Sequence, residues 1–188
     1  MIKSFLSLIL FSIIISTPLF ANEKVIISSY DDDGFYILDE DKNVIGGYAY
    51  DLQSALNRYL KWDVGYSLGD WKECQENVLE GKTDLLFGVF KTDEREKCYS
   101  FNTEPIAIVT NNVCARVDAE ALNGNYTKRT GKTVGLIDGS VSSQKFKDFL
   151  NKNKIDVNYV IGASSKDLRD RLKNHKIDYL VLNTNIID

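Results

Sequence analysis

The sequence predicts an α/β protein of two lobes, each a mainly parallel sheet flanked by helices. Apolar runs of strand length alternate with amphipathic helical patterns, an order typical of parallel sheets with right-handed crossovers. The order strand, helix, strand, helix, strand occurs in both halves of the chain. In each half the last strand follows a short basic turn, as TDLLFGV after Lys82 and IDYLVL after Lys176. Two such units with a cleft between them predict a ligand-binding shape.

Four elements are predicted between residues 25 and 68. Residues 25–29 are apolar and β-branched and predict the first strand. Residues 35–38 and 44–45 flank an acidic tip and predict a hairpin. Residues 48–60 predict a helix and residues 62–68 alternate as a strand. The predicted apolar face of the helix comprises Leu52, Ala55, Leu56, Tyr59 and Leu60.

Residues 70–102 form the region around which the first half is organised. Apolar residues from Trp71 to Leu79 recur at helical spacing, and Gly81 stands where a C-terminal cap glycine belongs. Residues 84–90 form a continuous apolar run, which predicts a strand covered on both faces. The sequence TDER at 92–95 predicts the start of a short helix. Because ligands of open α/β sheets bind beyond the carboxyl ends of strands, we expect a site between Phe90 and Arg95.

The second half repeats the pattern after a change in composition. Residues 106–117 predict a long apolar strand, and the polar segment 118–132 predicts a change of domain. Strands are then predicted at 133–137, 156–161 and 177–182. Helices are predicted at 141–150, with Phe146, Phe149 and Leu150 facing the core, and at 164–172, with a serine cap.

The first 21 residues have the pattern of an export signal. Lys3 precedes an apolar run at residues 5–15, and residues 18–21 form a cleavage region ending in alanine. The run is shorter than the about 20 residues of a membrane span, and an uncleaved anchor is the alternative. We therefore expect a signal peptide at 1–21, a first lobe at 22–117 and a second lobe at 118–188, in a periplasmic or extracellular protein.

Charge and composition exclude several functions. The formal net charge is −4 and no basic run occurs, so no nucleic-acid partner is expected. The single histidine, His175, lies between Lys173 and Lys176 on a polar turn, where a solvated surface residue is expected. Because no nucleophile–base spacing or carboxylate pair can be assigned, we predict a non-enzymatic protein.

The cysteines and the acidic run do not predict a metal site. Cys74, Cys98 and Cys114 allow at most one internal disulfide, for which Cys74–Cys98 is the conceivable pair and free buried thiols are the alternative. Cys114 lies in an apolar run and predicts a core position. No CxxC motif occurs, and the acids at 31–33 lack the alternating spacing of a calcium loop. No cofactor is expected.

An ordered set of motifs is similar to those of extracellular solute-binding proteins of family 3. They are GGYAYDL at 46–52, GDW at 69–71, LEGKTDL at 79–85, TDER at 92–95, SF at 100–101, GKTVG at 131–135, DGS at 138–140 and IDYLVL at 177–182. They span essentially all of the chain after residue 21. The resemblance implies a periplasmic binding protein type II-like fold that closes over amino acids or related small solutes. The helix starts GYAYDL and GDWKEC resemble the branch found as sensor portions of histidine kinases and diguanylate cyclases.

The resemblance also implies ligand contacts, each with a structural alternative. Trp71 falls where an aromatic ring covers the ligand, or it is a hydrophobic staple at a helix start. Arg95 falls where an arginine forks onto a ligand carboxylate, or it pairs with a neighbouring acid such as Glu94 or Glu96. Ser140, which follows Gly139 at a helix start, falls where a hydroxyl and free backbone N–H groups hold an anion, and it is also the expected helix cap.

Three positions depart from the family pattern. Phe90 stands where amino-acid binders have Ser or Thr, Val141 replaces a common Thr, and Asn183 replaces an Asp that pairs with the ligand's ammonium group. An amide is a weaker partner for a cation than a carboxylate. A standard amino acid and a more apolar or differently charged solute are therefore both plausible ligands at Trp71, Phe90, Arg95, Ser140 and Asn183.

Function is expected to be solute capture, either for uptake by an ABC-type permease or as the sensor part of a fused membrane signalling protein. The alternatives are an enzyme on the same fold, such as a dehydratase or a peptidoglycan lyase, and a structural surface protein. The family's chain returns from the second lobe to complete the first. Since the sequence stops at Asp188, we expect an incomplete second lobe belonging to a longer protein.

Overall fold

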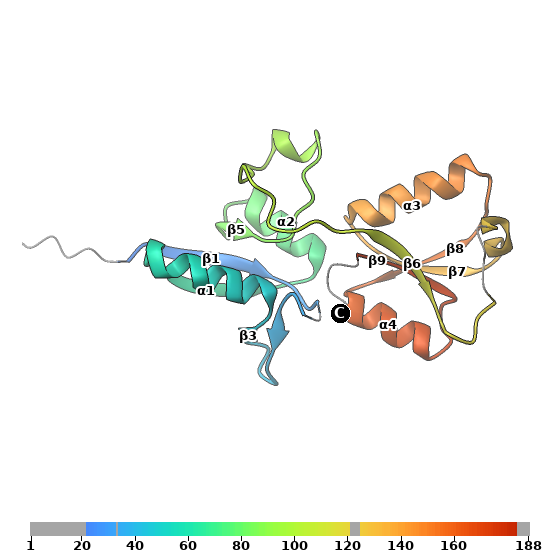
Figure 1. Cartoon of the computed structure of the whole chain (residues 1–188), viewed down its shortest axis with the longest axis horizontal. Helices are drawn as coiled ribbons and strands as arrows, with labels where there is room; N and C mark the ends of the chain where they lie inside the picture. Colours follow the sequence, from blue (N-terminus) through green and yellow to red (C-terminus); the bar gives the residue numbers. More distant parts are fainter. Residues whose placement is uncertain (1–21, 33, 121–124, 184–188) are drawn as a thin grey trace, which may run out of the picture.

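The computed structural model describes residues 22–32, 34–120 and 125–183, which form two α/β lobes (Figure 1). The predicted signal peptide at 1–21 lies outside the described residues. Within the described residues, none of the helices has the length and apolar character to cross a membrane. The lobes are side by side, with β1, α1 and α2 in one and β6–β9 with α3 and α4 in the other.

The first lobe is built on a sheet of three parallel strands in the order β4-β1-β5. These strands are β1 (Lys24–Ser29), β4 (Asp63–Leu68) and β5 (Leu85–Leu86). Helix α1 (Tyr48–Leu60) connects towards β4, and α2 (Trp71–Leu79) connects β4 to β5. Strands β1 and β4 and both helices confirm the prediction to within a residue. The Asp70 carboxylate accepts from the backbone N–H of Glu73, and the Glu73 carboxylate accepts from that of Asp70, which fixes the start of α2.

The predicted hairpin is confirmed as β2 (Ile37–Leu38) paired with β3 (Val44–Gly46). It leads into α1 through Gly47, whose φ of 104° favours glycine. A side chain at this position would place its Cβ 2.5 Å from the Phe35 carbonyl oxygen. Phe35, Tyr36 and Ala49 form a small buried cluster under the hairpin. Gly47 therefore allows α1 to begin directly against this aromatic cluster.

The predicted apolar face of α1 is wrong. The residues that it buries are Ala49 and Gln53, whereas Leu56, Tyr59 and Leu60 are exposed. Gln53 is buried because its side-chain oxygen accepts a 2.8 Å hydrogen bond from the Tyr66 hydroxyl on β4. A polar residue with a partner thus replaces the expected apolar contact.

Two predicted strands are shorter than expected. The run at 84–90 contributes only Leu85–Leu86 as strand β5, which is half-buried at the edge of the sheet and is not covered on both faces. The run at 106–117 contributes only β6 (Asn111–Ala115), and both Ile108 and Val117 are exposed. An apolar run forms a strand only where a neighbouring strand offers backbone hydrogen-bond partners.

The second lobe is a sheet of four strands in the order β6-β9-β7-β8, in which only the β6–β9 pair is antiparallel. Its other strands are β7 (Thr133–Ile137), β8 (Asn158–Gly162) and β9 (Tyr179–Asn183). Helices α3 (Val141–Lys152) and α4 (Ser165–Lys173) lie on opposite faces of this sheet (Figure 1). The predicted strands and helices are confirmed with shifts of two residues or fewer at their ends.

Each face of the second sheet has its own core. Phe146 and Leu150 of α3 pack against Val134 and Val181, and Leu168 and Leu172 of α4 pack against Leu180 among others. Phe149, predicted to face the core, is 37% exposed. Ser164 caps α4 as predicted, since its hydroxyl accepts from the backbone N–H of Asp167. The second lobe is therefore a three-layer unit.

The connection between the lobes precedes β6. The predicted boundary after Val117 leaves this strand in the first lobe, whereas the structure pairs Asn111 of β6 with Asn183 of β9 in the second sheet. An antiparallel partner was not expected from the sequence, because the second half reads as parallel β/α units. The strand β6 thus joins the second sheet although it comes before the polar segment 118–132.

Candidate functional site

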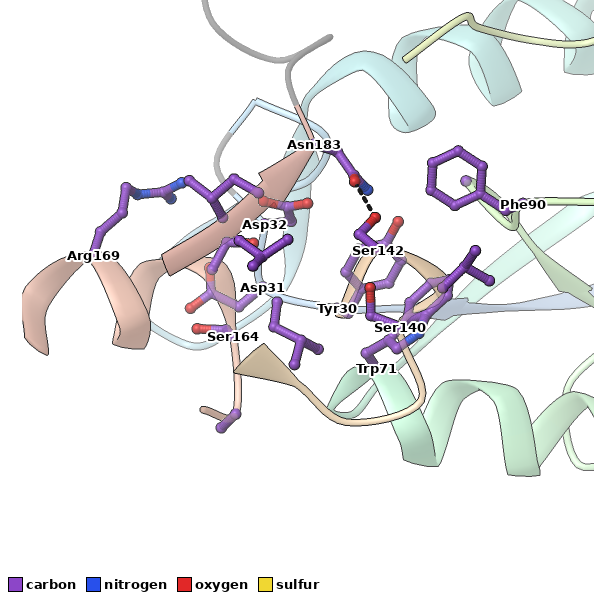
Figure 2. A pocket seen from close by; sticks show the side chains of 17 residues that line it. Tyr30, Asp31, Asp32, Trp71, Phe90, Ser140, Ser142, Ser164, Arg169 and Asn183 are labelled. Carbon is purple, nitrogen blue, oxygen red and sulfur yellow. Dashed lines mark hydrogen bonds between the residues drawn. The ribbon is translucent and has the colours of Figure 1, made fainter. Parts of the chain in front are cut away.

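A cavity lies between the two lobes and is lined from both (Figure 2). From the first lobe come Tyr30, Asp31, Asp32, Trp71, Gly88 and Phe90. The main polar groups from the second lobe are Ser140, Ser142, Ser164, Arg169 and Asn183. The space open to the centre of a water molecule is about 80 Å³. One water needs about 10–15 Å³ by the same measure, so the cavity has the size for a small solute.

Strand ends determine which residues reach the cavity. Tyr30 follows β1, the loop from Asp138 to Ser140 follows β7, Ser164 comes soon after β8, and Asn183 ends β9. Open α/β sheets bind ligands outside the carboxyl ends of their strands. Both lobes turn these ends towards one another, so the shared cavity is a consequence of the topology.

Four of the predicted site residues, Trp71, Phe90, Ser140 and Asn183, line this cavity. Arg95 is not among the lining residues. It begins the short 3₁₀ helix η1 (Arg95–Lys97), with its backbone N–H donating to the Thr92 hydroxyl. The predicted helix start at 92–95 is thereby confirmed as a single 3₁₀ turn.

Arg95 binds neutral acceptors of both lobes. Its guanidinium donates to the Phe90 carbonyl at 3.2 Å, to Gln75 Oε1 at 2.7 Å and to the Gly139 carbonyl at 3.0 Å. The neighbouring Glu96 pairs with Lys91 instead. Burial lowers the pKa of Arg95. The arginine therefore connects α2 with the loop after β7.

The Gly139 carbonyl also accepts from the indole N–H of Trp71 at 3.2 Å. Gly139 has a φ of 66°, and a Cβ there would lie 2.8 Å from the Gln75 amide nitrogen. This glycine lets the second-lobe loop approach α2 closely. Lys72 and Asp138 add an exposed ion pair at 3.5 Å between the same two segments. Trp71 thus has a cross-lobe contact in addition to its place on the cavity wall.

Aromatic rings form the first-lobe wall of the cavity. The Tyr30 ring meets Trp71 edge-on, with ring centroids 5.0 Å apart, and stacks on Phe35 at 5.7 Å. The Tyr30 hydroxyl donates to the Phe87 carbonyl. Its burial, with a smaller contribution from the Asp32 charge, raises the pKa of Tyr30 well above its ordinary value. These rings offer an apolar, neutral surface to a solute.

Ser140 and Ser142 occupy the start of α3. Ser140 stands at the cap position, but its hydroxyl makes no capping hydrogen bond. The Ser142 hydroxyl is buried and lies 2.6 Å from Asn183 Oδ1 and 2.7 Å from Asn111 Oδ1. Ser140 therefore lines the cavity with a hydroxyl that does not cap the helix, whereas the Ser142 hydroxyl contacts the side chains of two asparagines.

Charged groups gather at another part of the cavity. Asp31, Asp32 and Arg169 line it together with Ser164 (Figure 2). In the described part of the chain, no group of three or more His, Cys, Asp or Glu residues could hold a metal ion. Asp33 of the acidic run lies outside the described residues. His175 is exposed after α4 and does not line the cavity.

The cysteines are free thiols in this structure. Cys74 is buried and its thiol donates to the Ser29 carbonyl at 3.2 Å, whereas Cys98 is exposed. The conceivable Cys74–Cys98 bridge is therefore not formed. Cys114 is half-buried against the α4-side core.

Sequence reasoning missed Tyr30, Asp31, Asp32, Ser142 and Arg169 as lining residues. For Tyr30 the signal was present, because it directly follows the first predicted strand. For Ser142 it was not, because its partners Asn111 and Asn183 come from strands whose pairing the sequence does not reveal. The site is thus larger than the predicted set, with the carboxylates of Asp31 and Asp32 from the first lobe and hydroxyl, amide and guanidinium groups from the second.

Two α/β lobes with a solute-sized cavity between the carboxyl ends of their strands define a two-lobed binding protein of the periplasmic type II fold. The model of the bacterial extracellular solute-binding proteins, family 3, matches residues 25–157. The chain belongs to this family. None of the curated proteins compared by sequence matches the chain.

Solved structures share the fold at low sequence identity. An ancestral arginine-binding protein bound to glutamine is 20% identical, with 88% of this chain and 72% of that chain covered and a TM-score of 0.74. An ancestral amino acid-binding protein, a precursor of cyclohexadienyl dehydratase, is 19% identical, with 87% and 72% covered and a TM-score of 0.75. A putative L-cystine ABC transporter from Listeria monocytogenes is 19% identical, with 85% and 68% covered and a TM-score of 0.68.

Proposed function

We propose that this protein is an exported receptor that captures one small, amino-acid-like solute in the cavity between its lobes. The family supports solute binding, and the similar structures include proteins described as binding arginine, glutamine or other amino acids. The observation that carries the proposal is the cavity itself. It takes aromatic rings and two carboxylates from one lobe and hydroxyl, amide and guanidinium groups from the other. Such a mixture is typical of small-molecule sites.

We propose that Trp71, Phe90, Ser140 and Asn183 contact the solute directly. Trp71 and Phe90 would cover its apolar surface, and Ser140 and Asn183 would supply hydrogen bonds. Arg95 would act indirectly, because its guanidinium holds the Gly139 carbonyl next to the lining residue Ser140. Lobe opening is required for entry, because Trp71 and Arg95 both bind the opposite lobe.

The captured solute would be delivered to an ABC-type permease or would be the signal for membrane domains of a sensor protein. The periplasm or the cell exterior is the proposed location for either role. Permease and ATPase genes beside the coding sequence would support delivery. A coding region for a histidine kinase or a diguanylate cyclase in the same protein would support sensing.

A thermal-shift screen tests solute capture. The purified protein is melted with amino acids, 2-oxo acids, amines and short peptides, and a solute that binds only the folded state raises the melting temperature. The variant Trp71→Ala should lose the shift, whereas Tyr59→Ala, which removes an exposed ring on α1, should keep it. A folded protein that responds to none of these compounds would contradict the proposal.

A further inference from the structure

Ser142 connects two asparagine amides with a single proton. Its hydroxyl oxygen lies within 2.7 Å of both Asn111 Oδ1 and Asn183 Oδ1. A hydroxyl donates one proton, and an amide oxygen donates none. Only one of these oxygens can therefore accept from Ser142, and the other amide must turn its Nδ2 towards the hydroxyl oxygen.

Exposure decides which amide turns. Asn111 is exposed, so water can bind its carbonyl oxygen after the turn. Asn183 is half-buried and makes the shorter contact with Ser142, through its Oδ1, which Figure 2 marks with a dashed line. The Oδ1 of Asn183 thus accepts from the Ser142 hydroxyl, and the Nδ2 hydrogens of Asn183 are left to bind a different acceptor.

The cavity that Asn183 lines also has apolar side chains at two positions. Phe90 and Val141 both line it, and neither side chain has a hydrogen-bonding atom. Within the described residues, no acceptor is recorded for Asn183 Nδ2. An N–H donor that loses water on lobe closure needs an acceptor from the solute, because an unpaired buried donor is costly.

We propose that Ser142 and Asn111 are positioning residues that make Asn183 a hydrogen-bond donor, and that this end of the cavity selects a solute with an oxygen acceptor there over one with an ammonium group. The inference rests on the proposed solute-binding function and names its ligand class. An ammonium group has only donors, so it meets Asn183 donor to donor. A carbonyl oxygen at the same place of the solute can accept the hydrogen bond that Asn183 Nδ2 donates.

Matched probe pairs test this selectivity. Each pair is an L-amino acid and its 2-oxo acid, such as leucine with 2-oxoisocaproate and phenylalanine with phenylpyruvate, and affinity is measured by calorimetry. The 2-oxo member should bind the wild type about tenfold more tightly, since one hydrogen bond is gained and one unpaired donor is avoided. Asn183→Asp should reverse the preference, because a carboxylate is an acceptor only.

Asn111→Asp tests the positioning role from outside the cavity. The new carboxylate takes the Ser142 proton, so Asn183 turns its Nδ2 to Ser142 and its oxygen to the solute. The preference for the 2-oxo member should then shrink or reverse. Asn112→Asp is the control, because it adds the same charge at the next position of β6, where alternate side chains point to opposite faces.

The outcomes separate the two proposals. A wild-type protein that binds the probes without favouring the 2-oxo members overturns this inference and leaves solute capture standing. Equal effects of Asn111→Asp and Asn112→Asp overturn the positioning role, because charge alone would then explain both. A folded protein that binds neither member of any pair but responds to an amine or a peptide in the thermal-shift screen overturns the inference alone. One that responds to no compound of the screen overturns the inference together with the proposed function.

Discussion

The Arg95 guanidinium donates a 3.0 Å hydrogen bond to the Gly139 carbonyl, which belongs to the opposite lobe. The same nitrogen, Nη2, donates to Gln75 Oε1 at 2.7 Å. Both partners of Nη2 are neutral oxygens of the protein, so neither of them is a carboxylate that would neutralise the charge of the arginine. It holds the lobes together through the loop that follows β7.

Replacing Gly139 with alanine should open the cleft. The residue has a φ of 66°, and the added Cβ would lie 2.8 Å from Gln75. We expect a loss of about 1–2 kcal/mol of stability from the left-handed backbone and a larger radius of gyration by small-angle scattering. Gly131→Ala is the matched control, since its φ is 76° and no atom lies within 4 Å of its Cβ. If both variants have the wild-type radius, the Gly139 contact does not hold the lobes.

Trp71 should report solute binding by fluorescence. The chain has two tryptophans, and only Trp71 lines the cavity. Addition of a solute should change the emission of Trp62→Phe as much as that of the wild type, because that variant keeps the reporting ring. In Trp71→Phe the change should vanish. A response that disappears with Trp62 instead would place the solute elsewhere.

Cys74 should resist thiol reagents in the folded protein. Burial, with repulsion from Asp70 as the next cause, raises the pKa of Cys74 from 9.0 to about 12. At pH 8 an Ellman-type reagent should label Cys98, which is exposed. The double variant Cys98→Ser/Cys114→Ser, which keeps only Cys74, should react far more slowly. Rapid labelling of this folded double variant would contradict the buried position of Cys74.

The same thiol gives a pH dependence of stability. Its pKa is higher in the folded than in the unfolded chain, so the unfolded state loses this proton first as the pH rises. Stability should therefore fall between about pH 9 and pH 12, by up to about 1.4 kcal/mol per pH unit from this group. Denaturant melts of the wild type and Cys74→Ala should diverge over this range, with the variant less sensitive to pH. Parallel curves would exclude the thiol as the cause.

Arg129 should be replaceable by an apolar side chain of similar length. It is 2% exposed, its guanidinium lies 4.4 Å from the Tyr126 ring centroid, and its Nε and Nη1 have no hydrogen-bond partner among the described residues. Burial lowers the pKa of Arg129. We expect Arg129→Met to change the free energy of unfolding by less than about 1 kcal/mol. The loss of the contacts between the guanidinium and the rings is offset because the cost of burying the charge is removed. Arg129→Ala should cost about 3 kcal/mol through the cavity that it leaves. Equal losses in chemical denaturation would show that the charge itself is required.

Helices and strands with a clear periodicity of apolar residues were predictable from the sequence. The elements against which they pack were not. Helix α2 was predictable because its apolar residues recur at helical spacing from Trp71 to Leu79 and Gly81 marks its end. The exposure of Ile108 was not, because an apolar run carries no information about whether a strand lies beside it. The buried side of α1 was missed because Gln53 depends on the Tyr66 hydroxyl of another element.

For the site, the rule of strand ends placed Phe90 near the cavity, and the family resemblance added Trp71, Ser140 and Asn183. The rule and the resemblance both put Arg95 at the ligand as well, whereas in the structure it does not line the cavity and binds Gln75 and Gly139, which meet only after both lobes have folded. The pairing of Ser142 with two asparagines was equally invisible, since it requires β6 to run antiparallel to β9.

That antiparallel pairing brings together the first and last described strand residues of the second lobe. The chain enters its sheet at Asn111 and reaches the last described strand position at Asn183, and these two residues are register partners. Paired residues of antiparallel strands lie about 5 Å apart. The segment 111–183 therefore begins and ends at the same place, so it could be exchanged as one unit between related proteins. Recombination at Asn111 and Asn183 would transplant Ser140, Ser142 and Arg169 together, and so the second-lobe wall of the cavity in one step.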